Sequence, residues 1–427
     1  MKQSCGQCDF PIQGFQYSSD LLRCGAFGMD SVAQRVGTPT YVYSAEAIRE
    51  NYRTYCRALK EIPHRVHYAV KANSCLAILA LLAREGAGFD IVSGGELYRV
   101  LKAGGDPREV VYSGVGKTRA ELQYALQSGV GTIHCESEPE LALLRDVAAE
   151  LGTSPAVGIR VNPDIDAKTH PYIATGLSEH KFGVAVEDAE ELYQRASEWS
   201  PLRLSSISCH VGSQIRDVAV FTEAVEQLLS LAHRLRNRGL PIDALNLGGG
   251  LGIGYATGEP STSISAYGKL LSRALEGQDL RVGIEPGRSI VGQAGILLSR
   301  VLFRKQSGQK TFLVVDGAMN DLVRPALYQA HHEILPVARR SARSVRCDVV
   351  GPICESGDFL AADRMLPAFE PGDLLAVATA GAYGFVLSSN YNARPRAAEV
   401  VIDGTDMRIA RRRETLEDLI RGEEAWE

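Results

Sequence analysis

The sequence lacks the hydrophobic segments that membrane and secreted proteins carry. Its longest weakly polar run, Leu374 to Leu387, includes Gly381 and Gly384 and is shorter than the roughly 20 residues that a spanning helix needs. The N-terminal stretch MKQSCGQCDFPIQGF has no apolar signal core. We therefore expect a cytoplasmic protein with no membrane partner.

A disulfide framework and a metal site are missing as well. The nine cysteines are scattered and odd in number, unlike the paired cysteines of small secreted domains. Cys5 and Cys8 have CxxC spacing, but no second pair accompanies them, so we expect a reduced terminus. His331 and His332 have no partner ligands at metal-binding spacing. We expect no bound metal.

An excess of positive charge is also absent. The net charge is −5, which argues against non-specific binding to nucleic acid. A hydrophobic content of 45% and a charged content of 23% are typical of globular proteins, and 427 residues suit one large domain plus a second.

Short β-rich runs alternate with helical patterns between residues 65 and 290. The predicted strands are Arg65–Val70, Phe89–Val92, Val110–Ser113, Thr132–Cys135, Val157–Val161, Ser205–His210, Ala244–Leu247 and Val282–Glu285. Apolar spacings of three and four predict helices between them, for example Leu76–Gly86, Glu96–Ala103, Glu138–Leu151, Val218–Arg238 and Ile264–Leu275. Each connection is long enough for the crossover that parallel strands require. Eight such units predict a (β/α)8 TIM barrel, with a doubly wound open sheet as the alternative.

Polar residues near the ends of these strands favour the barrel, because barrel enzymes gather their chemistry at the C-terminal ends of the strands. These residues are Lys71, Asp90, Ser113, Arg160, His210 with Ser213, Gly248 to Gly250, and Glu285 to Arg288. After about residue 290, β-rich runs with Pro/Gly-rich turns predict a second, antiparallel β domain. We expect residues 43–288 to form the barrel, 289–427 the β domain, and 1–42 a segment that joins the β domain.

The glycines after the seventh predicted strand indicate a phosphate site. NLGGGLGIG (246–254) offers exposed backbone N–H groups, and Gly287 and Arg288 follow the eighth strand. Pyridoxal phosphate needs such a site, together with an amine for a Schiff base, a residue against its ring and an acid at its ring nitrogen. Lys71, His210 and Glu285 would fill these three roles.

Ten ordered segments resemble the fold-type III, alanine-racemase-like pyridoxal-phosphate decarboxylases. They are FGMDSVAQRVGTPTYVYS (27–44), HYAVKANS (67–74), GFDIVSGGELYRVLKAG (88–104), VNPDIDAKTHPYIATGLSEHKFGV (161–184), CHVGSQI (209–215), NLGGGLGIGY (246–255), IEPGRSIVG (284–292), DGAMNDLVRPALYQAHHEI (316–334) with GPICESGDFL (351–360), and GAYGFVLSSNYNARPRAAEV (381–400). The resemblance covers nearly the whole chain. It implies the removal of one carboxyl group, at the D-centre of meso-2,6-diaminopimelate, to give L-lysine and CO2.

The resemblance also implies a role for each site residue. Lys71, Cys354, His210 and Glu285 would be catalytic, with Lys71 bonded to the cofactor and Cys354 as a proton donor. The cofactor-binding set would be Lys71, Asp90, Arg160, His210, Ser213, Gly248, Gly249, Gly250, Glu285, Pro286, Gly287, Arg288 and Tyr383. The substrate-binding set would be Arg288, Arg324, Tyr328, Glu355 and Tyr383. A homodimer would follow, because Cys354 and Glu355 of family members reach the active site of the other subunit.

Other functions remain open on the same scaffold. A related decarboxylase could act on ornithine, arginine or a carrier-linked amino acid. Arg324 argues against the diamine-forming enzymes, whose substrates have no second carboxylate for a guanidinium to bind. Glu285 argues against a racemase, and the retained Lys71, His210 and Cys354 argue against a regulatory binding protein without cofactor.

Overall fold

The chain divides into two compact units. The computed structural model describes residues 11–165, 181–341 and 343–426, so that Cys5 and Cys8 lie outside the described residues. The barrel unit comprises Arg49–Ile253 and Ser261–Ser289, and the β unit comprises Met1–Ile48, Gly254–Pro260 and Ile290–Glu427.

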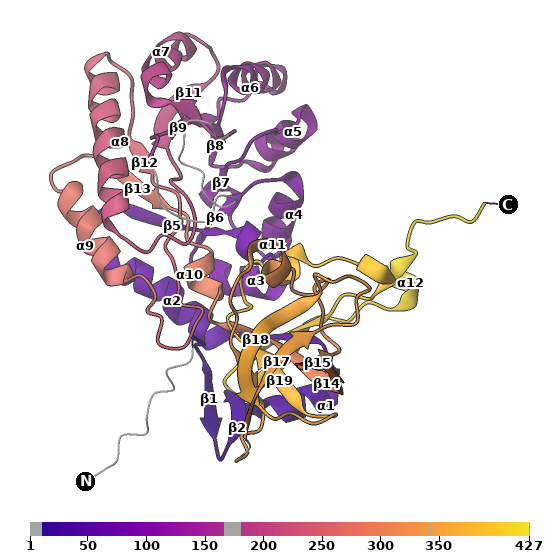
Figure 1. Ribbon diagram of the computed structural model, residues 1–427. Coiled ribbons are helices and arrows are strands. Elements are labelled where there is room, and N and C mark those ends of the chain that lie inside the picture. The colour runs from indigo at the N-terminus through magenta and orange to yellow at the C-terminus, as the bar shows by residue number, and fades with distance from the viewer. Residues whose placement is uncertain (1–10, 166–180, 342, 427) are drawn as a thin grey trace. The chain divides into compact units, whose positions relative to one another are not determined.

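Eight parallel strands form the closed sheet of the barrel unit (Figure 1). They are β5 (His64–Ala69), β6 (Gly88–Ile91), β7 (Val110–Tyr112), β8 (Thr132–Cys135), β9 (Ala156–Asn162), β11 (Arg203–Ser208), β12 (Ala244–Asn246) and β13 (Arg281–Ile284). Neighbours along the chain pair with one another, and β13 pairs with β5 to close the ring. The predicted (β/α)8 barrel is confirmed, and the open-sheet alternative is excluded.

Helices connect the strands and lie on the outside of the barrel (Figure 1). They are α3 (Leu76–Arg84), α4 (Gly94–Lys102), α5 (Arg119–Ser128), α6 (Glu138–Leu151), α7 (Val186–Ser197), α8 (Ala219–Asn237) and α9 (Ile264–Ala274). Four of them begin at a Ser or Thr whose hydroxyl accepts a backbone N–H of the first turn, as Thr118 does from Glu121. The apolar stripe of each helix is buried, and α8 contributes Phe221, Val225 and Leu228 to the core.

Glycines make room for polar side chains within the barrel strands. His67 on β5 pairs with Gly88 on β6, and His134 on β8 pairs with Gly158 on β9. A Cβ atom on Gly158 would lie 2.8 Å from His134 Cδ2 and 2.4 Å from Ser206 Oγ. Any larger residue there would displace these polar side chains, whereas barrel interiors are commonly filled by Val, Ile and Leu.

A nine-stranded sheet, seven strands of which follow one path, forms the centre of the β unit. Its order is β18 (Phe359–Pro367), β17 (Ser344–Val350), β15 (Lys310–Val315), β14 (Gly295–Ser307), β4 (Thr40–Ser44), β20 (Ala398–Asp403) and β21 (Asp406–Arg411), and β19 (Leu374–Val377) joins β14 to β16 (Ile334–Pro336). Most pairings are antiparallel, while β4–β20 and β15–β17 are parallel. A second β domain is thus present, and β4 lies near the middle of its sheet.

Alternating side chains of these strands form the core of the β unit. Val42, Ile296, Leu298, Ala376 and Val400 are buried in one hydrophobic cluster. The N-terminal strands β1 (Phe15–Ser18), β2 (Leu21–Cys24) and β3 (Phe27–Gly28) and helix α1 (Met29–Val36) add further side chains to the same cluster. The unit therefore combines segments from both ends of the chain in one core.

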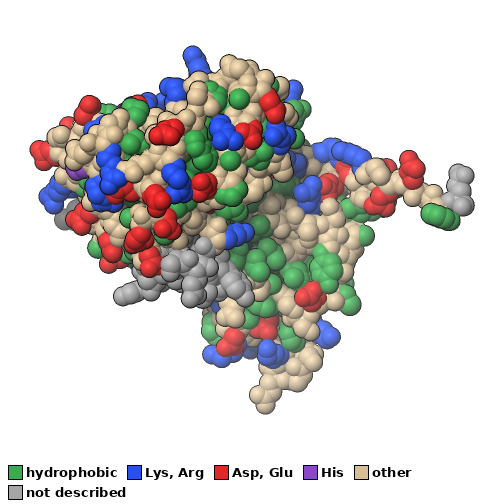
Figure 2. All heavy atoms as spheres, turned by 90° about the horizontal axis from the view of Figure 1, so that it is seen from above, with side chains coloured by type: hydrophobic (Ala, Val, Ile, Leu, Met, Phe, Trp, Pro, Cys, Tyr) green, Lys and Arg blue, Asp and Glu red, His purple; other side chains and the backbone are tan. Residues whose placement is uncertain are grey.

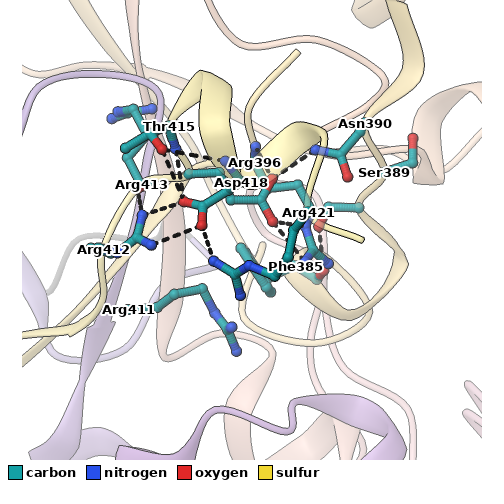
Figure 3. A network of polar contacts seen from close by, with 12 residues as sticks. Phe385, Ser389, Asn390, Arg396, Arg411, Arg412, Arg413, Thr415, Asp418 and Arg421 are labelled. Atoms are coloured by element: carbon teal, nitrogen blue, oxygen red, sulfur yellow. Dashed lines mark hydrogen bonds and ion pairs between the residues drawn. The ribbon is translucent and has the colours of Figure 1, made fainter. Parts of the chain in front are cut away.

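Ion pairs hold the C-terminal segment of the β unit in place (Figure 3). Asp418 in the short helix α12 (Leu416–Leu419) accepts hydrogen bonds from Arg412 and Arg421 and closes a capping box with Thr415. Upstream, the carboxylate of Glu414 accepts from Arg396 Nε at 2.9 Å. Such exposed pairs contribute modestly one by one but act together as a network.

Acidic and basic side chains are interspersed on the face drawn in Figure 2. Among the described residues, no helix is both long and apolar enough to cross a membrane.

Candidate active site

A cavity of about 330 Å³ in the barrel unit brings four of the predicted site residues together. Lys71, Arg160, His210 and Glu285 line it, each at or near the C-terminal end of its strand. This is the end of the barrel at which enzymes of this fold bind their substrates. Of the polar residues near the strand ends, Lys71, Ser113, Arg160, His210 and Glu285 therefore line one cavity.

Lys71 lies in a single 3-10 turn, Val70–Ala72, directly after β5. Its Nζ atom is 2.8 Å from Asp90 Oδ2 on the adjacent strand β6. Asp90 is fully buried, whereas the Lys71 side chain keeps 34% of its surface exposed. The buried carboxylate thus fixes the direction of an amine that remains accessible from the cavity.

His210 follows β11 and is held as a neutral ring. Its Nδ1 accepts the backbone N–H of Gly249 at 3.0 Å, so that the ring proton belongs on Nε2. Burial first, and then the positive charges of Lys71 and Arg160, lower the pKa of His210 well below its usual value. A neutral imidazole can pack against an aromatic ring without a charge to solvate.

Glu285 holds a proton near neutral pH. Burial, reinforced by the negative charge of Asp90, raises the pKa of Glu285 to about 8 against the opposing effects of Lys71, Arg160 and a hydrogen bond with Asn246. A carboxyl group with this pKa can share its proton with a basic ring nitrogen.

The glycine segment after β12 is so closely packed that it excludes side chains. A Cβ atom on Gly249 would lie 2.1 Å from the carbonyl oxygen of Glu285, and one on Gly250 would lie 2.3 Å from that of Gly212. Nearby, Arg288 Nη2 donates to Ser213 Oγ at 2.8 Å. Phosphate is bound by donors of these kinds: the backbone N–H groups of glycines, a hydroxyl group and a guanidinium. The donor set therefore fits pyridoxal phosphate.

Two residues that line this cavity, His134 and Phe182, and one that contacts Arg160, Glu136, were not among the predicted site residues. His134 lines it and lies 3.3 Å, through Nδ1, from Ser113 Oγ. Glu136 accepts from Arg160 Nη1 at 3.0 Å, and the Arg160 guanidinium lies over the ring of Phe182 at 4.9 Å. The alternation along β8 and its extension, with His134 and Glu136 on one face, was the available signal.

Arg324 and Tyr328 lie on helix α11 (Arg324–Tyr328) of the β unit. Arg324 is buried, with its guanidinium 4.6 Å from the ring centre of Tyr255 and its Nη1 3.1 Å from His332 Nε2. Tyr328 is half-buried. Neither Tyr255 nor His332 was predicted as a site residue, since neither belongs to a known chemical motif.

The remaining predicted residues lie in two loops of the β unit. Cys354 and Glu355 are exposed, and the backbone N–H of Cys354 donates to Asn392 Oδ1 at 2.8 Å. Tyr383 is half-buried and has a left-handed backbone with φ of 55°. In the described parts of the chain, no group of three or more His, Cys, Asp or Glu side chains could hold a metal ion.

Comparison with known proteins gives the family. The model of the pyridoxal-dependent decarboxylase family, pyridoxal binding domain, matches residues 45–292. A diaminopimelate decarboxylase of Pseudomonas aeruginosa is 53% identical over 96% of this chain and 98% of its own length. The crystal structure of AQ1208 from Aquifex aeolicus has a TM-score of 0.90 at 42% identity and covers 96% of this chain and 97% of its own. Diaminopimelate decarboxylase from Helicobacter pylori, complexed with L-lysine, has a TM-score of 0.89 at 41% identity over 92% of this chain and 98% of its own.

Proposed function

Because the chain belongs to the pyridoxal-dependent decarboxylase family, we propose that it removes the D-centre carboxyl group of meso-2,6-diaminopimelate to give L-lysine and CO2. The observation that carries this proposal is the cavity that joins Lys71, His210 and Glu285. The reaction is the last step of lysine biosynthesis, and the enzyme is a carboxy-lyase. Relatives named for this activity match the chain over almost its whole length.

Pyridoxal phosphate is the cofactor, and when bound it supplies the electron-withdrawing ring that accepts the electron pair left by CO2. Lys71 would supply the amine that holds the cofactor covalently, and Asp90 would direct this amine. Glu285 holds a proton at the ring nitrogen, which keeps the ring electron-poor. His210, as a neutral imidazole, packs against the ring face.

The phosphate is bound by the residues around the glycine segment. They are Ser213, Gly248, Gly249, Gly250, Gly287 and Arg288, while Arg160, Pro286 and Tyr383 belong to the wider cofactor-binding set. Their backbone N–H groups and the Arg288 guanidinium offset the negative charge without a metal ion.

Residues of the β unit, together with Arg288, recognise the end of the substrate that does not react. Arg324 and Tyr328 bind its carboxylate and Glu355 binds its ammonium group, while Tyr383 contacts substrate and cofactor. Cys354 donates the proton that replaces the lost carboxyl group. The enzyme acts as a cytoplasmic homodimer in which Cys354 and Glu355 serve the active site of the other subunit. By sequence boundaries, residues 43–288 form the cofactor-binding domain, residues 289–427 the β domain, and residues 1–42 a segment joined to the β domain, although residues 43–48 and 254–260 pack with the β unit.

The first test measures the purified protein with the cofactor added. We expect visible absorbance from covalently bound cofactor, and CO2 release from meso-diaminopimelate but not from lysine, ornithine or arginine. An absorbing protein that is inert toward all four amino acids would favour a carrier-linked substrate. If the purified protein with added cofactor shows no visible absorbance, the assignment of Lys71 is contradicted.

A further inference from the structure

We propose that His332 and Tyr255 are positioning residues for Arg324 and aim its guanidinium at the carboxylate of the non-reacting end of the substrate. The inference rests on the proposed function, which assigns Arg324 to that carboxylate. All three residues belong to the β unit, although Tyr255 is 69 positions away from Arg324 in the sequence.

The hydrogen bonds of His332 determine which ring nitrogen carries its proton. Nδ1 lies 2.8 Å from the carbonyl oxygen of Ala378, which can only accept, so Nδ1 carries the proton. Nε2 lies 3.1 Å from Arg324 Nη1, which can only donate, so Nε2 supplies the lone pair. His332 is 1% exposed, and Ala378 follows strand β19. A neutral imidazole therefore connects Arg324 to the sheet.

Tyr255 holds the guanidinium from a second side. Its ring centre is 4.6 Å from Arg324 Cζ, and its ring meets that of His332 edge to face at 5.4 Å and 84°. The segment that carries Tyr255 is fixed by the Glu259 carboxylate, which accepts the backbone N–H of Tyr255 at 2.6 Å and that of Ala256 at 3.0 Å.

Neither of these contacts neutralises the charge of Arg324. A carboxylate partner at the same place would orient the guanidinium but would compete with the substrate carboxylate for it. A neutral acceptor and an aromatic face fix the direction of the guanidinium, and neither brings a negative charge that would compete with the substrate. This is the arrangement expected of an arginine that is prepared for an incoming anion.

The test compares two ligands that differ by one carboxylate. L-lysine carries the carboxylate that Arg324 binds, and cadaverine is the same diamine without it. In His332→Phe, a similar ring remains against Tyr255 but both nitrogens are gone. We expect the Kd of L-lysine for the cofactor-loaded enzyme, measured by calorimetry, to rise by about tenfold, while that of cadaverine changes by less than about twofold. The KM for diaminopimelate should rise by about as much, with a smaller change in kcat.

Three variants separate positioning from general damage. His331→Phe is the matched control, because His331 is the adjacent histidine, with 40% of its side chain exposed, and should leave both Kd values unchanged. His332→Gln restores one donor and one acceptor and should recover part of the loss. Tyr255→Leu should weaken L-lysine binding, whereas Tyr255→Phe, which keeps the ring face, should not. If His332→Phe does not fold, the comparison of these two Tyr255 variants tests the inference instead.

Two outcomes would overturn this inference alone, and a third would also contradict part of the proposed function. An unchanged Kd for L-lysine in both His332→Phe and Tyr255→Leu would show that neither residue positions Arg324. If the Kd values of L-lysine and cadaverine rise equally, His332 and Tyr255 have only a structural role. Equal affinity of the wild-type enzyme for the two ligands would overturn the role of Arg324 itself and, with it, this inference.

Discussion

The amine of Lys71 and the carboxylate of Asp90 lie 2.8 Å apart, on a lysine that is partly exposed and an aspartate that is fully buried. A buried carboxylate keeps its cationic partner in a narrow range of directions, because the carboxylate loses its ion pair when the partner turns away. The amine is thus held at the wall of the cavity. The electrostatic role of Lys71 can therefore be tested separately from the covalent role that we propose for it.

Lys71→Arg tests that separation. Arginine retains the positive charge, so we expect the ion pair with Asp90 and the melting temperature to be largely preserved. A guanidinium does not form the covalent bond to the cofactor, so CO2 release should fall by at least about 10³-fold. The visible absorbance of the covalent bond should disappear. Lys102→Arg, on the surface over Tyr98, serves as the control and should behave as wild type.

Gly249→Ala tests the close packing at the phosphate site. The new Cβ atom would lie 2.1 Å from a backbone oxygen that cannot move without moving Glu285, so a strain of about 1–3 kcal/mol is expected. Cofactor affinity, measured by titration of the apoenzyme, should fall by about tenfold or more. Gly95→Ala is the matched control, since its nearest neighbour is 3.8 Å away. Equal cofactor affinity in both variants would show that the segment does not bind the phosphate.

Glu285 makes the stability of the apoenzyme depend on pH. Its pKa is about 8 in the folded chain against an ordinary value of 4.5, so the folded state binds more protons between these values. Stability from this group is therefore complete below about pH 4.5 and is lost as the pH rises through 8. When the pH is raised from 6.5 to 8, the free energy of unfolding of the wild-type apoenzyme should fall by on the order of 1 kcal/mol more than that of the Glu285→Gln apoenzyme.

Urea denaturation of both apoproteins at the two pH values measures this difference. Because Glu96 and Asp321 also have pKa values raised to about 7, only the comparison with Glu285→Gln isolates the group. Parallel pH profiles for the two proteins would contradict the assignment of a raised pKa to Glu285.

Local sequence patterns were sufficient for the barrel because each strand is followed by its own helix. The predicted strand Thr132–Cys135 has the same bounds in β8, and Val282–Glu285 is displaced by one residue in β13. The predicted strand Ser205–His210 extended too far, since β11 ends at Ser208 and His210 lies in the loop, where its ring nitrogen can reach Gly249. Hydrophobic alternation does not reveal such an early end.

Contacts between distant segments could not be predicted in this way. β4 pairs with β14 and β20, which lie more than 200 residues further along the chain, and no local pattern specifies that pairing. The contact of Arg324 with Tyr255 could not be predicted for the same reason, because the two residues lie far apart in the sequence. The resemblance to a family supplied roles for single residues, but the residues that position them, such as His332, became visible only through distances between side chains.

A mixing experiment tests the homodimer and its shared active sites. If Cys354 serves the site of the other subunit, Lys71→Ala and Cys354→Ala dimers should each be nearly inactive. A heterodimer of the two would contain one site with both residues intact and one site with neither. Random exchange makes half of the dimers mixed, so activity should recover to about a quarter of the wild-type value.

The pair Lys71→Ala and Glu285→Ala is the matched control, because both residues lie in the cavity of one barrel unit and no intact site can form. Recovery in the first mixture alone, after unfolding and refolding the proteins together, would establish the sharing. No recovery in either mixture, with dimers confirmed by sedimentation, would place Cys354 in the active site of its own chain.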